Sequence, residues 1–181
     1  LSIISKGYLK DTSAPTLVGS VVLASDSSRL KAGQRIAAGP VSITTGTLRL
    51  RLDNGALLNL QAPAKLDITS QSRAMLQQGS VTVHCPASAI GFVLEGPGLS
   101  AVDLGTEFGM AVADGNTEIH VLDGGVQWRS DARQSGLLEA GAGIASRGTD
   151  SFSEITARET IFNRDFSAPE PIEPFGRLLA Y

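Results

Sequence analysis

Short segments of alternating apolar and polar residues, each followed by a glycine-containing turn, recur along this chain. The clearest covers residues 47–52, where the leucines fall on one face and Thr47, Arg49 and Arg51 on the other. Side chains of a strand alternate between its two faces, so this pattern predicts a strand with one buried face. Asn54-Gly55 follows directly, and this dipeptide is a strong signal for a β-hairpin. The repetition of such units predicts an all-β fold.

The arrangement of these units leaves two architectures open. Stacked short antiparallel hairpins form either a small β-solenoid-like domain or a twisted β-sandwich, and glycine corners suit both. Gly19-Ser20-Val21 and Gly79-Ser80-Val81 repeat each other, but no fixed period holds along the chain. At Pro63 we expect the strand pattern to break, because proline cannot donate a hydrogen bond within a sheet.

A change of rhythm near residue 148 divides the chain into three parts. Residues 1–16 are weakly patterned and predict an N-terminal arm, residues 17–148 predict the β-domain, and residues 149–181 predict a partly irregular C-terminal extension. Within the extension, residues 153–162 fit one short helix. The proline-rich stretch at residues 168–174 predicts a stiff, extended linker.

Composition excludes several classes of protein. Hydrophobic residues make up 42% and charged residues 18% of the 181 residues, which is typical of a globular chain. The net charge is -3 and no run of Lys or Arg is present, so we expect no nucleic-acid binding. The single cysteine, Cys85, forms no intramolecular disulfide. Apolar runs fall short of the roughly 20 residues that a membrane helix needs.

The most informative stretch is residues 102–110, in which a glycine corner joins two strand patterns. Glycine adopts positive φ without strain, which suits a sharp corner. Asp and Thr side chains hydrogen-bond backbone groups at turns, so we expect Asp103 and Thr106 to hold the corner and Glu107 to face solvent. The structural motif predicted here consists of Asp103, Gly105, Thr106, Glu107 and Phe108.

Other titratable residues allow a chemical interpretation that we weigh against a structural one. Asp103 and Glu107 as a carboxylate pair would suit a glycoside hydrolase or calcium, but no calcium loop is present. His84 and Cys85 are adjacent and point to opposite faces of a strand, and His120 is distant in sequence. They make a poor chelate and a poor nucleophile–base pair. We therefore predict no enzyme, no catalytic residue, no cofactor and no metal site.

Two further features concern the surface. Trp128 follows a hairpin, and an indole either packs at the core or a sheet edge, or contacts a partner or a sugar. We favour packing and keep Trp128 as the candidate contact for a protein partner or glycan. Arg49 and Arg51, with Arg73 nearby, predict a basic stripe on a solvated strand face.

The spacing of these motifs resembles the FecR domain over residues 17–146. This is the extracytoplasmic domain of bacterial regulators of the iron-dicitrate type (anti-sigma factors), and the motif at residues 103–108 looks most like the branch found in planctomycetes. The residues that carry the resemblance are Leu30-x-x-Gly33, Ile36-x-x-Gly39, Leu50-x-Leu52-x-x-Gly55-Ala56, Ala62-Pro63-Ala64-x-Leu66, Leu76-x-x-Gly79-x-Val81-x-Val83, Gly91-Phe92-x-Leu94, Val102-Asp103-Leu104-Gly105-Thr106-Glu107-Phe108-Gly109 and Val121-x-x-Gly124-Gly125-Val126.

The resemblance implies a non-catalytic sensor or interaction domain of a membrane-anchored regulator. Such a domain lies in the periplasm, is anchored by an N-terminal helix outside this chain, and relays a signal from an outer-membrane receptor or another protein to a sigma factor. From the residues, the contact we expect is pairing of an exposed strand edge with a partner. The alternatives are a carbohydrate-binding or structural module of a cell-surface protein and, third, a glycoside hydrolase.

Overall fold

The computed structural model describes residues 14–25, 29–147 and 151–167. The predicted arm up to residue 13 and the predicted linker at 168–174 lie outside these residues. The described part contains 14 strands and two single turns of 3-10 helix, which confirms the all-β prediction. The strands are β1 (Leu17–Ala24), β2 (Arg35–Ala37), β3 (Gly39–Ile43), β4 (Thr47–Leu52), β5 (Leu57–Ser70), β6 (Arg73–His84), β7 (Val93–Gly96), β8 (Leu99–Asp103), β9 (Glu107–Ala113), β10 (Asn116–Asp123), β11 (Gly125–Ser130), β12 (Ser135–Glu139), β13 (Ala142–Arg147) and β14 (Ser151–Thr156).

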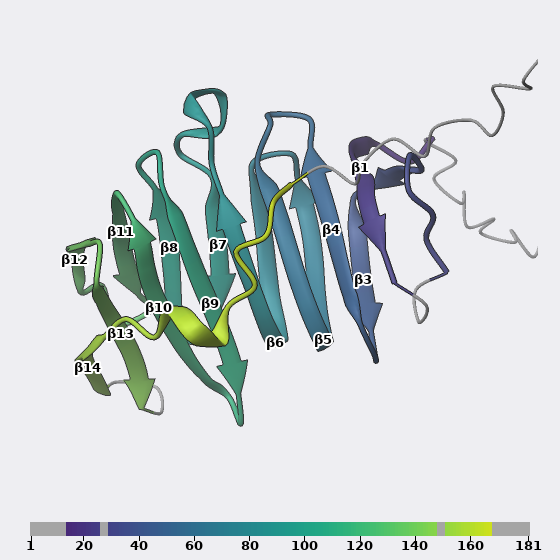
Figure 1. The fold of residues 1–181 in the computed structure, drawn as a ribbon. Coiled ribbons are helices and arrows are strands. Elements are labelled where there is room, and N and C mark those ends of the chain that lie inside the picture. The colour runs from purple at the N-terminus through teal and green to yellow at the C-terminus, as the bar shows by residue number, and fades with distance from the viewer. Residues whose placement is uncertain (1–13, 26–28, 148–150, 168–181) are drawn as a thin grey trace, which may run out of the picture.

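All the strands belong to one sheet that folds over into two layers (Figure 1). The front layer contains β2, β1, β4, the first half of β5, the second half of β6, β9, β10, β13 and β14, paired in that order. The back layer contains β3, the second half of β5, the first half of β6, β7, β8, β11 and β12. Every pairing is antiparallel except that of β6 with β7. The sheet is neither a regular solenoid nor two separate sheets.

The long hairpin of β5 and β6 joins the two layers. Our prediction of a break at Pro63 is wrong, because β5 is a single strand of 14 residues that includes Pro63. Pro63 lies where the pairing register between β5 and β6 shifts, between Gln61 and Lys65, so its missing N–H removes no regular ladder bond. Opposite it, Gly79 has a φ of 94° and is the point at which β6 passes from one layer to the other.

The core lies between the layers and is built mainly from aliphatic side chains. Leu48, Leu50 and Leu52 of β4 are buried, as the alternation predicts, and the hairpin from β4 to β5 forms at Asn54-Gly55. Phe92 and Phe108 are the largest fully buried side chains. Burying apolar surface in this way is the main favourable contribution to folding.

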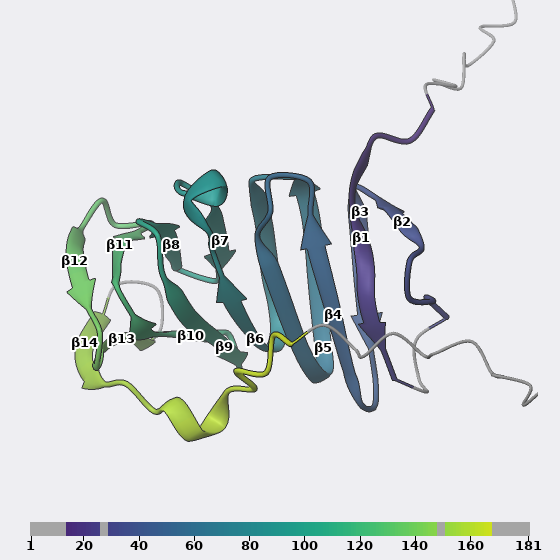
Figure 2. The same ribbon diagram turned by 45° about the horizontal axis from the view of Figure 1, so that its top comes forward.

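The C-terminal extension differs from its prediction. In place of a helix over residues 153–162, the chain forms β14, which pairs in register with β13, and then one 3-10 turn at Glu159–Ile161. An isolated helix of this length is only marginally stable in water, whereas the open edge of β13 provides hydrogen-bond partners for the backbone of β14. Residues 157–167, which we call the strap, then run back across the outer face of the front layer (Figure 2). The boundary near residue 148 stays a prediction.

Candidate functional site

The glycine corner between β8 and β9 is held by the side chain of Asp103. Its carboxylate is fully buried, and it accepts a hydrogen bond from the Gly105 N–H at 2.8 Å and another from the Thr106 hydroxyl. Gly105 has the positive φ, 94°, that the corner requires. Burial raises the pKa of Asp103, while the bonds from Thr106 and Gly105 act in the opposite direction. The carboxylate therefore serves the local backbone.

Glu107 does not face solvent as we expected. Its carboxylate pairs with the guanidinium of Arg164 in the strap, and Arg164 also contacts Glu159 at 2.8 Å. A hydrolytic pair needs two carboxylates facing a common substrate. Asp103 is bonded to the corner and Glu107 to the strap, so they do not form such a pair.

Replacing Asp103 with alanine is expected to destabilise the domain by about 1–3 kcal/mol, because the Gly105 N–H and Thr106 hydroxyl lose their buried acceptor. The midpoint of thermal unfolding measures the effect. Asp103→Asn is the control, since the amide oxygen still accepts one bond and the loss should be smaller. Equal stability of the alanine variant and the parent would contradict a structural role for this carboxylate.

Cys85, His84 and His120 have different surroundings. Cys85 is buried, and burial with the nearby Asp103 raises the pKa of its thiol, so the reactive thiolate is disfavoured. His84 is exposed and its ring contacts Phe166, whereas His120 is buried. In residues 14–25, 29–147 and 151–167, no group of three or more His, Cys, Asp or Glu side chains is placed to hold a metal ion.

Trp128 lies on β11 and is half-buried. Its indole contacts the ring of Phe152 on β14, with centroids 6.1 Å apart, and fills the space that a Cβ at Gly136 would occupy. The indole thus connects the end of the back layer to β14. Its role as a partner or glycan contact stays a prediction.

A row of aligned residues crosses the outer face of the front layer, one from each of five neighbouring strands. Register places Arg49 opposite Asn59, Asn59 opposite Thr82, Thr82 opposite Gly109, and Gly109 opposite His120. We call these five residues the outer row. They are buried although they face away from the core, because the strap covers them.

The basic stripe predicted for Arg49, Arg51 and Arg73 is therefore wrong. The Arg49 guanidinium is buried and donates to the backbone oxygens of Asp165 and Ser167 in the strap. Arg51 is exposed, and Arg73 lies in the back layer, where it pairs with Glu95 at 2.5 Å. The sequence pattern could not show that the strap would cover one of these arginines.

The strap contacts four of the five residues of the outer row, namely Arg49, Asn59, Gly109 and His120. The Asn59 side-chain amide donates to the backbone oxygens of Asn163 and Asp165 at 3.1 and 3.2 Å. Phe162 covers Gly109, where a Cβ would lie 2.5 Å from its ring, and contacts the His120 ring at 5.2 Å between centroids. Glycine is thus required at 109 for this close approach.

Burial under the strap also makes the stability of the domain depend on pH. Desolvation lowers the pKa of His120, with Glu118 acting in the opposite direction and Arg158 in the same one. Unfolded histidine titrates near about pH 6.5, so below that pH the unfolded chain binds a proton that the folded chain resists. Stability should fall as the pH drops from about 7 to about 5.

His120→Gln should reduce that slope, since glutamine does not titrate. Thermal unfolding of both proteins across this pH range measures it. Identical slopes would contradict the assignment to His120.

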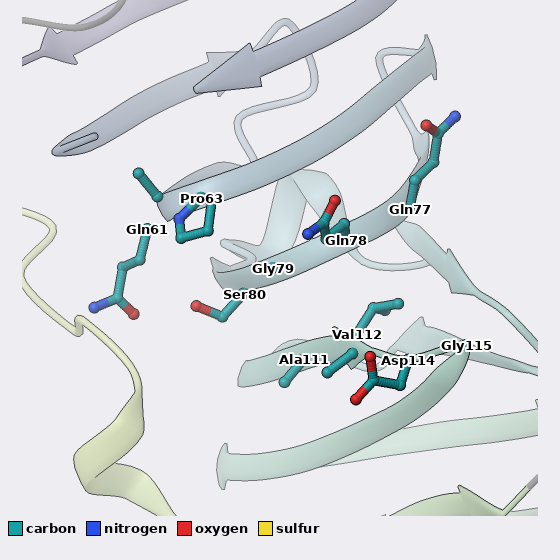
Figure 3. Close-up of a pocket in the computed structure, with 12 residues that line it drawn as sticks. Gln61, Pro63, Gln77, Gln78, Gly79, Ser80, Ala111, Val112, Asp114 and Gly115 are labelled. Carbon is teal, nitrogen blue, oxygen red and sulfur yellow. The ribbon is translucent and has the colours of Figure 1, made fainter. Parts of the chain in front are cut away.

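A groove of about 620 Å³ opens where β5 and β6 bend between the layers (Figure 3). Its described lining is uncharged apart from Asp114, and contains the side-chain amides of Gln61, Gln77 and Gln78. No aromatic ring is among these lining residues, so the groove lacks the stacking surface typical of sugar sites.

Most residues of the outer row were not indicated by any sequence pattern. The signal that could have found Asn59 is its position among leucines in β5, where a polar residue interrupts an apolar run. Gly109 and Phe162 gave no such signal, because their contact joins distant parts of the chain.

Comparison with known proteins agrees with this fold. Two crystal structures of a candidate anti-sigma factor from Parabacteroides distasonis ATCC 8503 each align with a TM-score of 0.54 and 15% identity, covering 65% of this chain and 59% of theirs. No curated protein matches the sequence. Among the described residues, no helix combines the length and apolar character needed to span a membrane. Residues 40–127 match the family model described as FecR protein, which confirms over this part of the chain the FecR resemblance predicted from the motifs.

Proposed function

We propose that this chain is a non-catalytic interaction domain of a sigma regulator, lying outside the cytoplasm and relaying a signal by protein contact. The observation that carries the proposal is the FecR match over residues 40–127. The similarity to the anti-sigma factor structures supports the same role at the level of fold. The engagement of Asp103 and Glu107 with the corner and the strap gives no support to hydrolysis.

The proposed contact is pairing of a partner strand with the open edge of β14. Within the described residues β14 pairs only with β13, and Ser153, Glu154 and Thr156 are exposed. The Ala157 N–H donates inward to the Gly141 oxygen at 2.9 Å. Because N–H groups alternate along an antiparallel strand, those of residues 152, 154 and 156 turn outward. An edge of this kind can accept a partner's backbone.

The test of the function uses the full-length gene in the source bacterium. Deleting the codons for residues 17–147 should change transcription of a gene set that depends on one sigma factor, measured by RNA sequencing. An unchanged transcriptome under the conditions in which the gene is expressed would overturn the proposal.

Glu154→Pro tests the mode of contact in the same assay. It removes an outward N–H and should reproduce the effect of the deletion, while Glu154→Ala keeps the N–H and should behave as the parent. Unfolding of the purified proteins checks that both variants fold. A folded proline variant with normal transcription would exclude the β14 edge as the contact.

A further inference from the structure

Side chains of the outer row bind mainly the main-chain atoms of the strap. Backbone oxygens of residues 163, 165 and 167 accept from Asn59 and Arg49, as described above. At the strap's own N–H groups, the Asn163 N–H donates to Gln61 Oε1 at 3.2 Å and the Arg158 N–H to His120 Nδ1 at 3.3 Å. Contacts to backbone groups do not depend on the identity of the side chains. The row therefore has the properties of a groove for an extended peptide.

The strap does not provide hydrogen-bond partners for all the buried polar atoms of the groove. Arg49 Nε, Asn59 Oδ1 and Thr82 Oγ1 are buried without a hydrogen-bond partner, and all three belong to neighbouring members of the outer row. A buried polar group left without a partner destabilises the structure that contains it. The three residues lie opposite one another on β4, β5 and β6, so a peptide that supplied hydrogen-bond partners to these atoms would bind more favourably than the strap.

Two further observations indicate that the strap can be exchanged. All five residues of the outer row lie inside the FecR match at residues 40–127, whereas residues 157–167 lie outside it. Of the strap's side chains only that of Phe162 is buried. A segment with so little buried apolar surface belongs to the least stable part of a fold.

Charges around the groove define the chemistry of its ligand. Glu118 pairs with Arg158 and Glu107 with Arg164, while Arg49 lies 3.7 Å from the Asp165 carboxylate. The ring of Phe162 lies between the two arginines in sequence. The groove thus fits an extended segment with an aromatic residue flanked by basic residues and followed by an acidic one.

We propose that the outer face of the front layer is a peptide-binding groove, held in this structure by the chain's own strap, and that an extended segment of a partner protein with this pattern binds there by displacing it. The strap then acts as a competitor, since a tethered segment has an effective concentration of about millimolar. The identity of the partner as a signalling protein rests on the proposed function, whereas binding of a segment to the groove does not.

Fluorescence anisotropy with the full chain tests the groove, using a labelled synthetic peptide of residues 157–167. The parent should bind it weakly, because its own strap occupies the site. Phe162→Ala removes the strap's buried side chain and should tighten binding by at least about tenfold. Ile161→Ala is the matched control, since Ile161 is exposed beside Phe162 and the variant should bind as weakly as the parent.

Two modified peptides test the recognition chemistry on the Phe162→Ala protein. One retains only Arg158, Phe162, Arg164 and Asp165 with alanine elsewhere, and should bind within about threefold of the full peptide, since the other contacts are to the backbone. The other has the full composition in scrambled order and should bind at least about tenfold more weakly. Adding Asn59→Leu to the Phe162→Ala protein should abolish binding of the full peptide.

Several results would overturn the proposal. A folded Phe162→Ala protein that binds no better than the parent would show that the groove is not exchangeable, and equal binding of the scrambled peptide would show that it has no specificity. Dimerisation of the parent in analytical ultracentrifugation that is lost in an Asn59→Leu variant would assign the groove to a second copy of the chain. An unchanged transcriptome would contradict the proposed function but not the groove, whereas absence of peptide binding would contradict the groove but not the proposed function.

Discussion

Gly79→Ala is expected to destabilise the domain by about 2–5 kcal/mol. Gly79 has a φ of 94°, a conformation that costs an L-residue free energy. A Cβ there would also lie 2.3 Å from the Pro63 oxygen and 2.7 Å from the Ala64 Cα, and neither backbone atom can move without disturbing β5. Both effects fall on the bend by which β6 changes layers. Urea denaturation followed by circular dichroism measures the loss.

Gly115→Ala separates the two causes. Gly115 also has positive φ, 73°, but nothing lies within 4 Å of its Cβ position. This variant should therefore lose only the conformational part, about 1–2 kcal/mol. Equal losses at the two positions would show that the close approach of β5 to β6 contributes nothing.

Phe108→Ala is expected to cost about 3–5 kcal/mol, the range for removing a buried aromatic ring. Phe108 is fully buried in β9, opposite Val83 of β6 and Val121 of β10, so truncation leaves a cavity between three strands of the front layer. The same denaturation experiment measures it, with a lowered midpoint and an unchanged slope if only stability is affected.

Leu104→Ala is the matched control in the same motif. Leu104 is 48% exposed, and its truncation should change stability by no more than about 0.5 kcal/mol. A loss at Leu104 as large as that at Phe108 would contradict the assignment of Phe108 to the core.

Local sequence patterns predicted the structure correctly where the interacting residues lie in the same short stretch. The alternation over residues 47–52 predicted β4 and its buried leucines, and Asn54-Gly55 predicted the hairpin that follows. The residue types at 103–106 predicted a corner held by side-chain bonds. Each of these inferences depends on residues within a few positions of one another, where side-chain period and φ preference act directly.

The misjudged residues depend on contacts between distant segments. Pro63 does not break β5 because the register of the pairing with β6 shifts beside it, which the sequence of β5 alone does not show. The helix expected over residues 153–162 gave way to β14 because the edge of β13 was available. Arg49 was expected in solvent and is buried by a segment 118 residues away.

The sequence by itself determined the all-β class, strands such as β4, the glycine corner and the family resemblance, because strand period, turn chemistry and motif spacing are local properties. Only the tertiary structure decided the folding of one sheet into two layers, the alignment of the outer row, and its burial by the strap. These depend on strand register and on contacts between residues that are 38 to 118 positions apart, which no short stretch of sequence encodes.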